Sequence, residues 1–205
     1  MATANWIFAS SLVSNPCWEL NAERVISSPT SLKFWEPFTT GPALFIHALL
    51  RASVSGNVRE GQIEFEIIPE VLAFNSNFLF RVPSETPTVN TDYNDSYTVQ
   101  ITKTGITWKY NTSIIGTRGF GTTVPSGQFY RLRLTWWEAY SLTNQLATAL
   151  KVEQLVASVY SMVGSIAYDT NRRNEAGGIN CIGVGMKCSS GTGETWFEDC
   201  IIYKA

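Results

Sequence analysis

Short segments in which apolar and polar residues alternate run through most of this chain, separated by Gly, Pro, Asn, Asp and Ser. Successive side chains of a β-strand point to opposite faces, so alternation is typical of a strand with one buried face. Turn residues gather at Ser55-Gly56-Asn57, Lys103-Thr104-Gly105, Pro125-Ser126-Gly127 and Gly177-Gly178. Many short strands with regular turns predict an all-β sandwich or barrel.

The predicted strands follow one another without a linker, a repeat or a low-complexity tract between them. A chain of 205 residues suits a single all-β domain, so we expect residues 1–205 to form one unit. Only Ser141 to Leu150 has mild helical propensity. The predicted strands are Cys17–Leu20, Ser31–Trp35, Ala43–Ala52, Gly61–Ile68, Phe78–Val82, Tyr97–Thr102, Gly105–Tyr110, Tyr130–Trp137, Ala147–Val152, Leu155–Val159, Asn180–Lys187 and Trp196–Lys204.

Alternation within single segments separates a core face from a solvent face. In Tyr130–Trp137, leucines and a tryptophan alternate with arginines, a threonine and a second tryptophan. We therefore expect the first set in the core and the second on an exposed sheet face. Gln62–Ile68 and Phe78–Val82 show the same pattern. The expected inward residues are Ile63, Phe65, Ile67, Phe78, Phe80, Val82, Leu132, Leu134 and Trp136, and the expected outward residues are Glu64, Glu66, Leu79, Arg81, Arg131, Arg133, Thr135 and Trp137.

The charge content narrows the classes of function. Charged residues make up 16% of the chain, below the roughly 25% of ordinary soluble domains, and Ser, Thr and Asn take their place. Such hydroxyl- and amide-rich surfaces are common in secreted, adhesive and virion proteins. The net charge is −2 and no Lys/Arg run occurs, so we expect no nucleic-acid partner.

Two further features of the sequence bear on where the protein is located. The longest apolar stretch, Ala43 to Leu50, is too short to span a membrane. Met1 to Trp6 lacks the basic and apolar regions of a secretory signal peptide. We expect an extracellular surface or a virion, reached either after removal of a signal or inside a larger particle.

The four cysteines leave two alternatives open. Cys181 and Cys188 flank six residues, while Cys17 and Cys200 lie near opposite ends of the chain and would meet if the terminal strands pair. All four are disulfide candidates, and the alternative is four buried thiols. No CxxC motif occurs and the chain has one His, which argues against a zinc site.

Several segments resemble, in chain order, the strands of a known superfamily. One carries a "G-x-(aliphatic)-x-F-x-(aliphatic)" pattern, another resembles "W-Y-x-L-R-L", and two near the end resemble "G-G-I-x-x-I-G-x-G … F-D-D-V-x-I-Y". These segments are Ser27–Phe34, Gly61–Pro69, Gln128–Leu134, Ala147–Val159 with an expected turn at Glu153-Gln154, Gly178–Gly185 and Thr195–Tyr203.

The superfamily is that of the concanavalin A-like, laminin-G-like jelly rolls. The resemblance implies two packed antiparallel sheets, one of them concave. The closing pattern also occurs in galactose-binding-like carbohydrate modules. Because these folds host lectins, glycosidases, adhesion modules and virion proteins, the resemblance implies no single function.

An enzymatic hypothesis comes from laminarinase-like glucanases, which carry acids in an E-x-D-x-(x)-E pattern on one strand. Glu64 and Glu66 are the candidate catalytic residues, and a retaining glycosidase needs two carboxyl groups about 5–5.5 Å apart. Three departures weaken the match. Glu66 replaces the Asp, Glu70 comes one residue late, and Pro69 interrupts the strand.

Carbohydrate binding without catalysis fits the pattern better. Aromatic rings contact the apolar side of a sugar, and polar groups nearby fix its hydroxyls. Glu64 and Glu66 share the expected face. The candidate ligand-binding residues are Trp137, Arg131, Arg133, Trp108, Tyr110 and Arg81, although neighbours on the same face of its strand favour a core position for Trp108.

A structural role in a virion or surface assembly is the alternative, with other surface proteins or copies of the same chain as partners. Trp, Tyr and Arg also dominate protein interfaces, so the same side chains serve either role. No cofactor is required by any of these readings. Calcium remains an option, with Asp169, Asn171 and Asp199 as candidate oxygen ligands.

Overall fold

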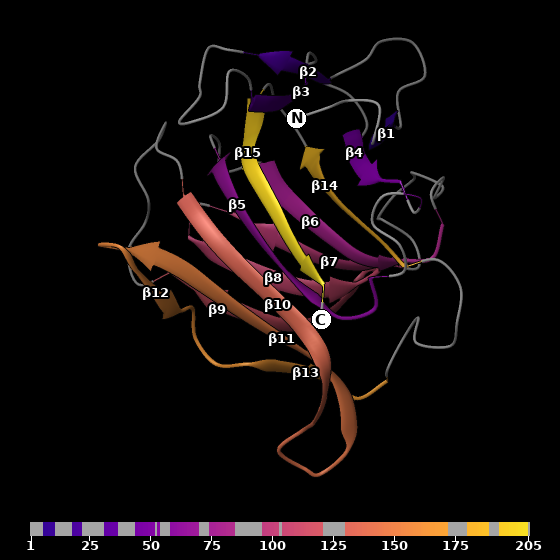
Figure 1. The fold of residues 1–205 in the computed structure, drawn as a ribbon, viewed down its shortest axis with the longest axis vertical. Helices are drawn as coiled ribbons and strands as arrows, with labels where there is room; N and C mark the ends of the chain where they lie inside the picture. The colour runs from indigo at the N-terminus through magenta and orange to yellow at the C-terminus, as the bar shows by residue number, and fades with distance from the viewer. Residues whose placement is uncertain are drawn as a thin grey trace.

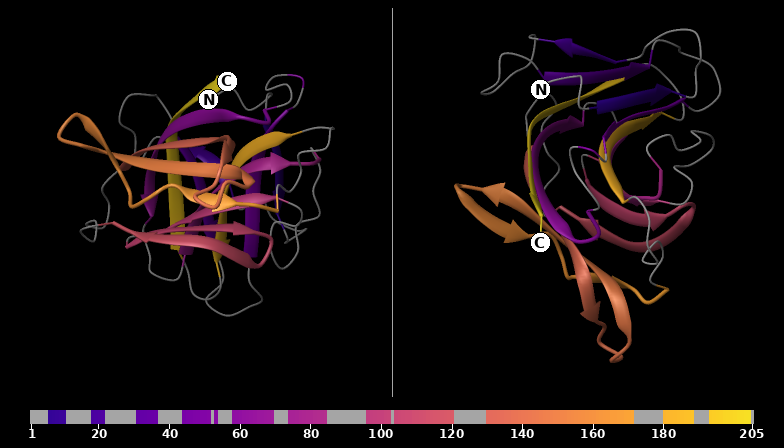
Figure 2. Two further views of the ribbon diagram at one scale, coloured as in Figure 1. Left: turned by 90° about the horizontal axis from the view of Figure 1, so that it is seen from below. Right: turned by 45° about the vertical axis from the view of Figure 1, so that its right-hand side comes forward.

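The computed structural model describes residues 6–10, 18–21, 31–36, 44–51, 53, 58–69, 74–84, 96–102, 104–120, 130–171, 180–188 and 193–204. These residues form two antiparallel β-sheets that pack face to face (Figure 1), and Figure 2 shows the two layers curving together. The predicted all-β, two-sheet jelly roll is therefore confirmed. Within the described part of the chain, no helix has the length and apolar character needed to cross a membrane.

The first sheet, called sheet A, has the order β1-β4-β14-β6-β7-β8-β9. Strands β1, β4, β14 and β6 are neighbours although they are distant in sequence, so the sheet brings together both ends of the chain, whereas β6 to β9 follow one another in chain order. Its strands are β1 (Trp6–Ser10), β4 (Leu44–Leu50), β14 (Cys181–Cys188), β6 (Phe74–Val82), β7 (Tyr97–Ile101), β8 (Gly105–Tyr110) and β9 (Ser113–Gly119).

The second sheet, called sheet B, has the order β12-β11-β10-β5-β15-β3-β2, and β13 also pairs with β11. Its long central strands, β10, β5 and β15, lie in front in Figure 1. Its strands are β12 (Val159–Met162), β11 (Leu146–Val156), β10 (Tyr130–Tyr140), β5 (Gly61–Pro69), β15 (Gly193–Lys204), β3 (Ser31–Glu36), β2 (Trp18–Asn21) and β13 (Ala167–Asp169).

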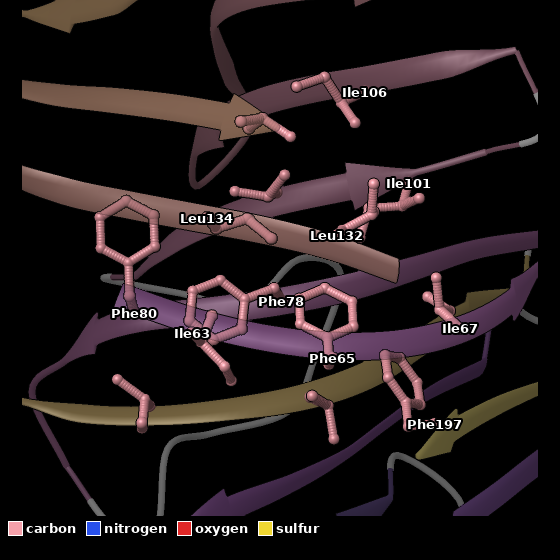
Figure 3. Packing of buried hydrophobic residues seen from close by; sticks show 14 of the residues in the cluster. Ile63, Phe65, Ile67, Phe78, Phe80, Ile101, Ile106, Leu132, Leu134 and Phe197 are labelled. Atoms are coloured by element: carbon pink, nitrogen blue, oxygen red, sulfur yellow. The ribbon is translucent and has the colours of Figure 1, made fainter. Parts of the chain in front are cut away.

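The core lies between the sheets and contains the inward residues predicted for β5 and β10 (Figure 3). Aromatic rings fill its centre. The Phe80 ring lies 5.0 Å from Tyr97 and 5.2 Å from Trp136, and Phe78 lies 5.5 Å from Trp136. Each of these four side chains is fully buried. Stacked and tilted rings at such distances add to the hydrophobic contribution of their buried area, so this cluster fixes the spacing of the two layers.

Some strand boundaries differ from the sequence prediction. Ala147–Val152 and Leu155–Val159 were expected to be separate strands with a turn at Glu153-Gln154. Both residues instead lie within β11 and pair with Arg133 and Leu132 of β10. The turn comes at Ala157-Ser158, because continuous pairing with β10 carries the strand past the two polar residues. Strands β1, β9, β12 and β13 were not predicted.

The outward position predicted for Arg81 is wrong. Arg81 has a φ of 52° at an irregularity in the pairing of β6 with β14, and this bulge reverses the alternation of side chains. Its side chain points between the sheets, is fully buried, and donates to the Arg59 carbonyl at 3.0 Å and the Thr148 hydroxyl at 2.7 Å. The same reversal places Val82 beside Leu79 in a separate buried cluster, not in the main core.

The β11–β12 turn holds residues in an unfavourable conformation. Val156 pairs with Val159 across a two-residue turn in which Ala157 and Ser158 have φ values of 47° and 67°. Two positive φ values define a type I′ turn, for which Asn-Gly is the favoured sequence. An L-residue other than Gly or Asn is disfavoured there.

We expect the double substitution Ala157→Asn with Ser158→Gly to raise the free energy of unfolding by about 1 kcal/mol, because it relieves this strain. Thermal and urea unfolding measure the change. Asn144→Ala is the opposite control, since Asn144 already occupies a positive-φ position (57°) in the β10–β11 loop and its loss destabilises. A lower melting temperature for the double variant would contradict the prediction.

Candidate functional site

The outer face of sheet B carries the largest group of predicted site residues. Arg131 lies opposite Glu66, and Arg133 lies between Glu64 of β5 and Glu153 of β11. Opposite charges on adjacent strands attract across the ladder. These residues and their neighbours form one surface, the charged face, which consists of Glu64, Glu66, Arg131, Arg133, Lys151, Glu153 and Tyr160.

Arg133 is the centre of the charged face. Its Nε donates to Glu64 Oε1 at 2.8 Å, its NH2 lies 2.8 Å from the same oxygen, and its NH1 lies 3.8 Å from Glu153 Oε2. Burial alone would lower the pKa of Arg133, but the hydrogen bond and charge of Glu64 outweigh it and raise the pKa above its usual value. The guanidinium therefore stays charged and fixed in orientation.

Tyr160 of β12 covers Arg133 and binds the same glutamate. Its ring centroid lies 3.6 Å from the guanidinium carbon, and its hydroxyl donates to Glu64 Oε2 at 3.0 Å. Burial raises the pKa of the Tyr160 hydroxyl, and the hydrogen bond to Glu64 adds to the rise. Both oxygens of Glu64 are thereby engaged, one by Arg133 and one by Tyr160.

The reach of Tyr160 shows that sheet B is bent at this edge. Strands β12 and β5 are separated by β11 and β10, which places them about 14 Å apart in a flat sheet. A direct hydrogen bond from Tyr160 to Glu64 requires the β11–β12 hairpin to curl over the outer face. Figure 2 shows the end of this hairpin standing out from the sandwich on the outer side of sheet B. The charged face is thus walled on one side by Tyr160.

Two further ion pairs extend the charged face. Arg131 NH2 lies 2.5 Å from Glu66 Oε1, and Lys151 Nζ lies 3.0 Å from Glu153 Oε1. Partly exposed pairs contribute only about 0–1 kcal/mol each to stability. Their main effect is to hold the side chains in defined positions on the surface.

A more neutral surface continues from the charged face towards one end of the sheet. The Thr135 hydroxyl donates to Gln62 Oε1 at 3.3 Å, and Gln62 lies opposite Tyr203 of β15. Tyr203 and Ile201 are each 46% exposed, and Trp137 is half-buried on β10. Rings, an amide and a hydroxyl are therefore presented beside the ion pairs.

The structure brings together some of the predicted site residues and separates others. Trp137, Arg131 and Arg133 share the outer face of sheet B, together with Glu64 and Glu66. The hypothesis that these two glutamates catalyse hydrolysis stays a prediction, and Glu70 lies outside the described residues. In the structure each glutamate accepts from an arginine, so each acts as an anchor for a cation.

Trp108, Tyr110 and Arg81 do not lie on this surface, and their assignment as ligand-binding residues stays a prediction. Trp108 is 1% exposed in the core, and Tyr110 packs against that core from sheet A, with its ring 5.1 Å from Tyr97. Arg81 lies between the sheets because of the bulge described above. None of the three faces the outer surface of sheet B.

Tyr160, Ile201 and Tyr203 lie on this face without having been predicted as site residues. Alternation of side chains could not place Ile201 and Tyr203, because the pairing of β15 with β5 shifts between Glu198 and Ile201. Tyr160 lies on a four-residue strand, too short for a pattern. In the sequence, only the aromatic residue near the end of β15, Tyr203, could have indicated a sugar-contacting position.

The candidate metal ligand Asp169 has other partners in the structure. Its Oδ2 accepts from the Tyr97 hydroxyl at 2.7 Å, and its Oδ1 accepts from the backbone N and the side-chain Nδ2 of Asn171, each at 3.1 Å. Among the described residues, no group of three or more His, Cys, Asp or Glu is placed to hold a metal ion. The side chain of Asp199 lies outside the described residues, and calcium binding stays a prediction.

The cysteine pairings are constrained in one respect. Cys181 and Cys188 lie at opposite ends of β14, about 23 Å apart along an extended strand, whereas a disulfide needs Cα atoms within about 7 Å. These two cysteines therefore cannot bridge each other. Cys17 and the side chains of Cys188 and Cys200 lie outside the described residues, so other pairings stay predictions.

Comparisons with known proteins identify the fold. No model of a known protein family and no curated protein matches the chain. Lectin II from Ulex europaeus is 14% identical, with a TM-score of 0.50 over 94% of this chain and 92% of that one. Alginate lyase vAL-1 from Chlorella virus is 7% identical, with a TM-score of 0.53 over 98% and 94%. At these identities the likeness shows the fold alone, which is the concanavalin A-like jelly roll.

We expect Tyr160→Phe to lower the free energy of unfolding by about 1 kcal/mol, because it removes the hydrogen bond to Glu64 and keeps the ring over Arg133. Urea denaturation measures the loss. Tyr140→Phe is the matched control, since the Tyr140 side chain is 67% exposed. Equal stability of Tyr160→Phe and the wild type would show that the hydroxyl contributes nothing to the charged face.

Proposed function

We propose that this chain is a non-catalytic carbohydrate-binding or adhesive module, displayed at a cell or virion surface. In this proposal the outer face of sheet B contacts the sugar. The proposal concerns binding, and it requires no cofactor.

One observation carries the proposal: half-exposed rings flank a pair of polar side chains on a rigid sheet. Tyr203 on β15 lies opposite Gln62 of β5, and Trp137 lies on β10 just beyond the end of its pairing with β5, so the two residues are two strand spacings apart, about 10 Å, and offset by two residues along the strands. Next to both rings, the Thr135 hydroxyl and the Gln62 amide form their hydrogen bond. Rings bind the C–H face of a sugar, and amides and hydroxyls exchange hydrogen bonds with its hydroxyls.

Preorganisation of this surface supports the same function. Ordering a mobile side chain on binding costs roughly 0.5–1.5 kcal/mol. The ion pairs and the Tyr160 contact already hold Glu64 and Arg133 in place, so a ligand meets fixed partners. The fold is compatible with this role, since one protein that shares it is named a lectin.

We expect wild-type protein to bind carbohydrates on a glycan array, and Trp137→Ala and Tyr203→Ala each to weaken that binding at least about tenfold, because each removes a contact ring. Isothermal titration with the best array ligand measures the affinities. Tyr140→Ala is the control, since this exposed tyrosine ends β10, three residues after Trp137, and therefore points to the other face of the strand. Absence of binding to every glycan would refute the proposal.

A second candidate function is assembly with other surface or virion proteins, including further copies of this chain. It is favoured by apolar side chains that two hairpins expose at their ends. Leu142, at the β10–β11 loop, is 93% exposed, and this hairpin extends beyond the sandwich in Figures 1 and 2. Val156, Val159 and Met162 of the β11–β12 hairpin are 53%, 63% and 52% exposed.

For this second function we expect sedimentation velocity to show concentration-dependent self-association of the purified chain. Leu142→Ser combined with Val159→Thr should reduce it, because both substitutions remove exposed apolar surface without touching the core. A monomer at all concentrations would exclude assembly between copies of the chain.

A further inference from the structure

Charges on the charged face balance in number but not in accessibility. The carboxylates are recessed, with side-chain exposures of 8% for Glu66, 14% for Glu64 and 12% for Glu153. The cations lie above them. The exposed fractions are 36% for Arg131, 28% for Arg133 and 34% for Lys151. A ligand approaching this face therefore meets positive charge first, although the whole chain carries a net charge of −2.

The three cations are regularly spaced. Arg131 and Arg133 occupy alternate positions of β10, about 6.5–7 Å apart along one face. Lys151 lies opposite Thr135, so it is the diagonal neighbour of Arg133, at about 7–8 Å. The cations thus follow a line across β10 and β11 that suits a chain with repeated negative groups.

Arg131 and Lys151 keep donors for a ligand, whereas Arg133 is engaged by Glu64 and Glu153 and is covered by Tyr160. Arg131 uses NH2 for Glu66, which leaves its Nε and NH1 without a partner among the described residues. Lys151 directs one interaction to Glu153, and an ammonium group has three donors. A guanidinium group matches the oxygen geometry of a carboxylate or sulfate. The ammonium group of an exposed lysine attracts the same anionic groups as a compact positive charge.

The geometry points to an anionic glycan as the ligand: a polysaccharide whose units carry carboxylate or sulfate groups, with Arg131 and Lys151 as the specificity-determining residues and Arg133 as a fixed positive charge between them. This inference rests on the proposed function and names its ligand class. Trp137 and Tyr203 contact the sugar rings, and the cations select for the acidic substituents. Glu64, Glu66 and Glu153 hold the cations in position from below.

Binding of the full chain to three immobilised polysaccharides tests the inference: a polyuronate, a sulfated glycosaminoglycan and a neutral β-glucan. We expect binding to at least one of the two anionic polymers, weakening as salt is raised. Lys151→Gln and Arg131→Gln should each lower that affinity about five- to tenfold, since each removes one charge-assisted contact. Whichever anionic polymer binds identifies the acidic group as carboxylate or sulfate.

Lys109→Gln is the matched control for Lys151→Gln, because Lys109 lies on β8 of sheet A and should leave binding unchanged. Thermal unfolding of each variant checks that it folds, and Arg131→Lys, which keeps the charge, should restore part of the affinity lost in Arg131→Gln. Preference for the β-glucan, lost in Trp137→Ala and kept in Lys151→Gln, would overturn the inference and leave the proposed function standing. Failure to bind any glycan would overturn both.

Discussion

The pairing of β5 with β10 is the constraint on which the core and the outer face both depend. In the observed register, Ile63 and Phe65 lie opposite Leu134 and Leu132, all of them buried, while Glu64 lies opposite Arg133 on the other side of the sheet. A shift by one residue would turn the apolar set towards solvent and bury the charged set. Burial of the apolar side chains therefore also enforces the ion pairs, although the pairs themselves add little stability.

This register also explains what could be predicted from the sequence. Alternation in Gln62–Ile68 and Tyr130–Trp137 was sufficient to assign both faces of β5 and β10, because neither strand has an irregularity there. Alternation gave the wrong face for Arg81. This residue has a positive φ at a bulge in the β6–β14 pairing, and its charged side chain therefore points into the interior. Bulges arise from pairing with strands distant in sequence, and a local pattern does not contain that information.

The candidate site was predicted in part for a related reason. Arg131, Arg133 and Trp137 are neighbours along a single strand, so the sequence alone indicated that they share a face. Tyr160 joins them only because a hairpin bends over the sheet, and its hydroxyl reaches Glu64, 96 positions earlier in the chain. The burial of Trp108 and the packing of Tyr110 against the core likewise depend on which sheet covers them, and no single strand specifies that.

The separation of the two faces of sheet B has an evolutionary consequence. Residues that hold the sandwich together alternate along the same strands with residues of the outer surface, so the two sets can mutate almost independently. Exchange of an outer side chain changes the surface of the sheet at little cost in stability, because its neighbours in the core are untouched. A scaffold of this kind can change its outer surface while retaining its architecture, and the same fold is indeed found at 7% and 14% identity.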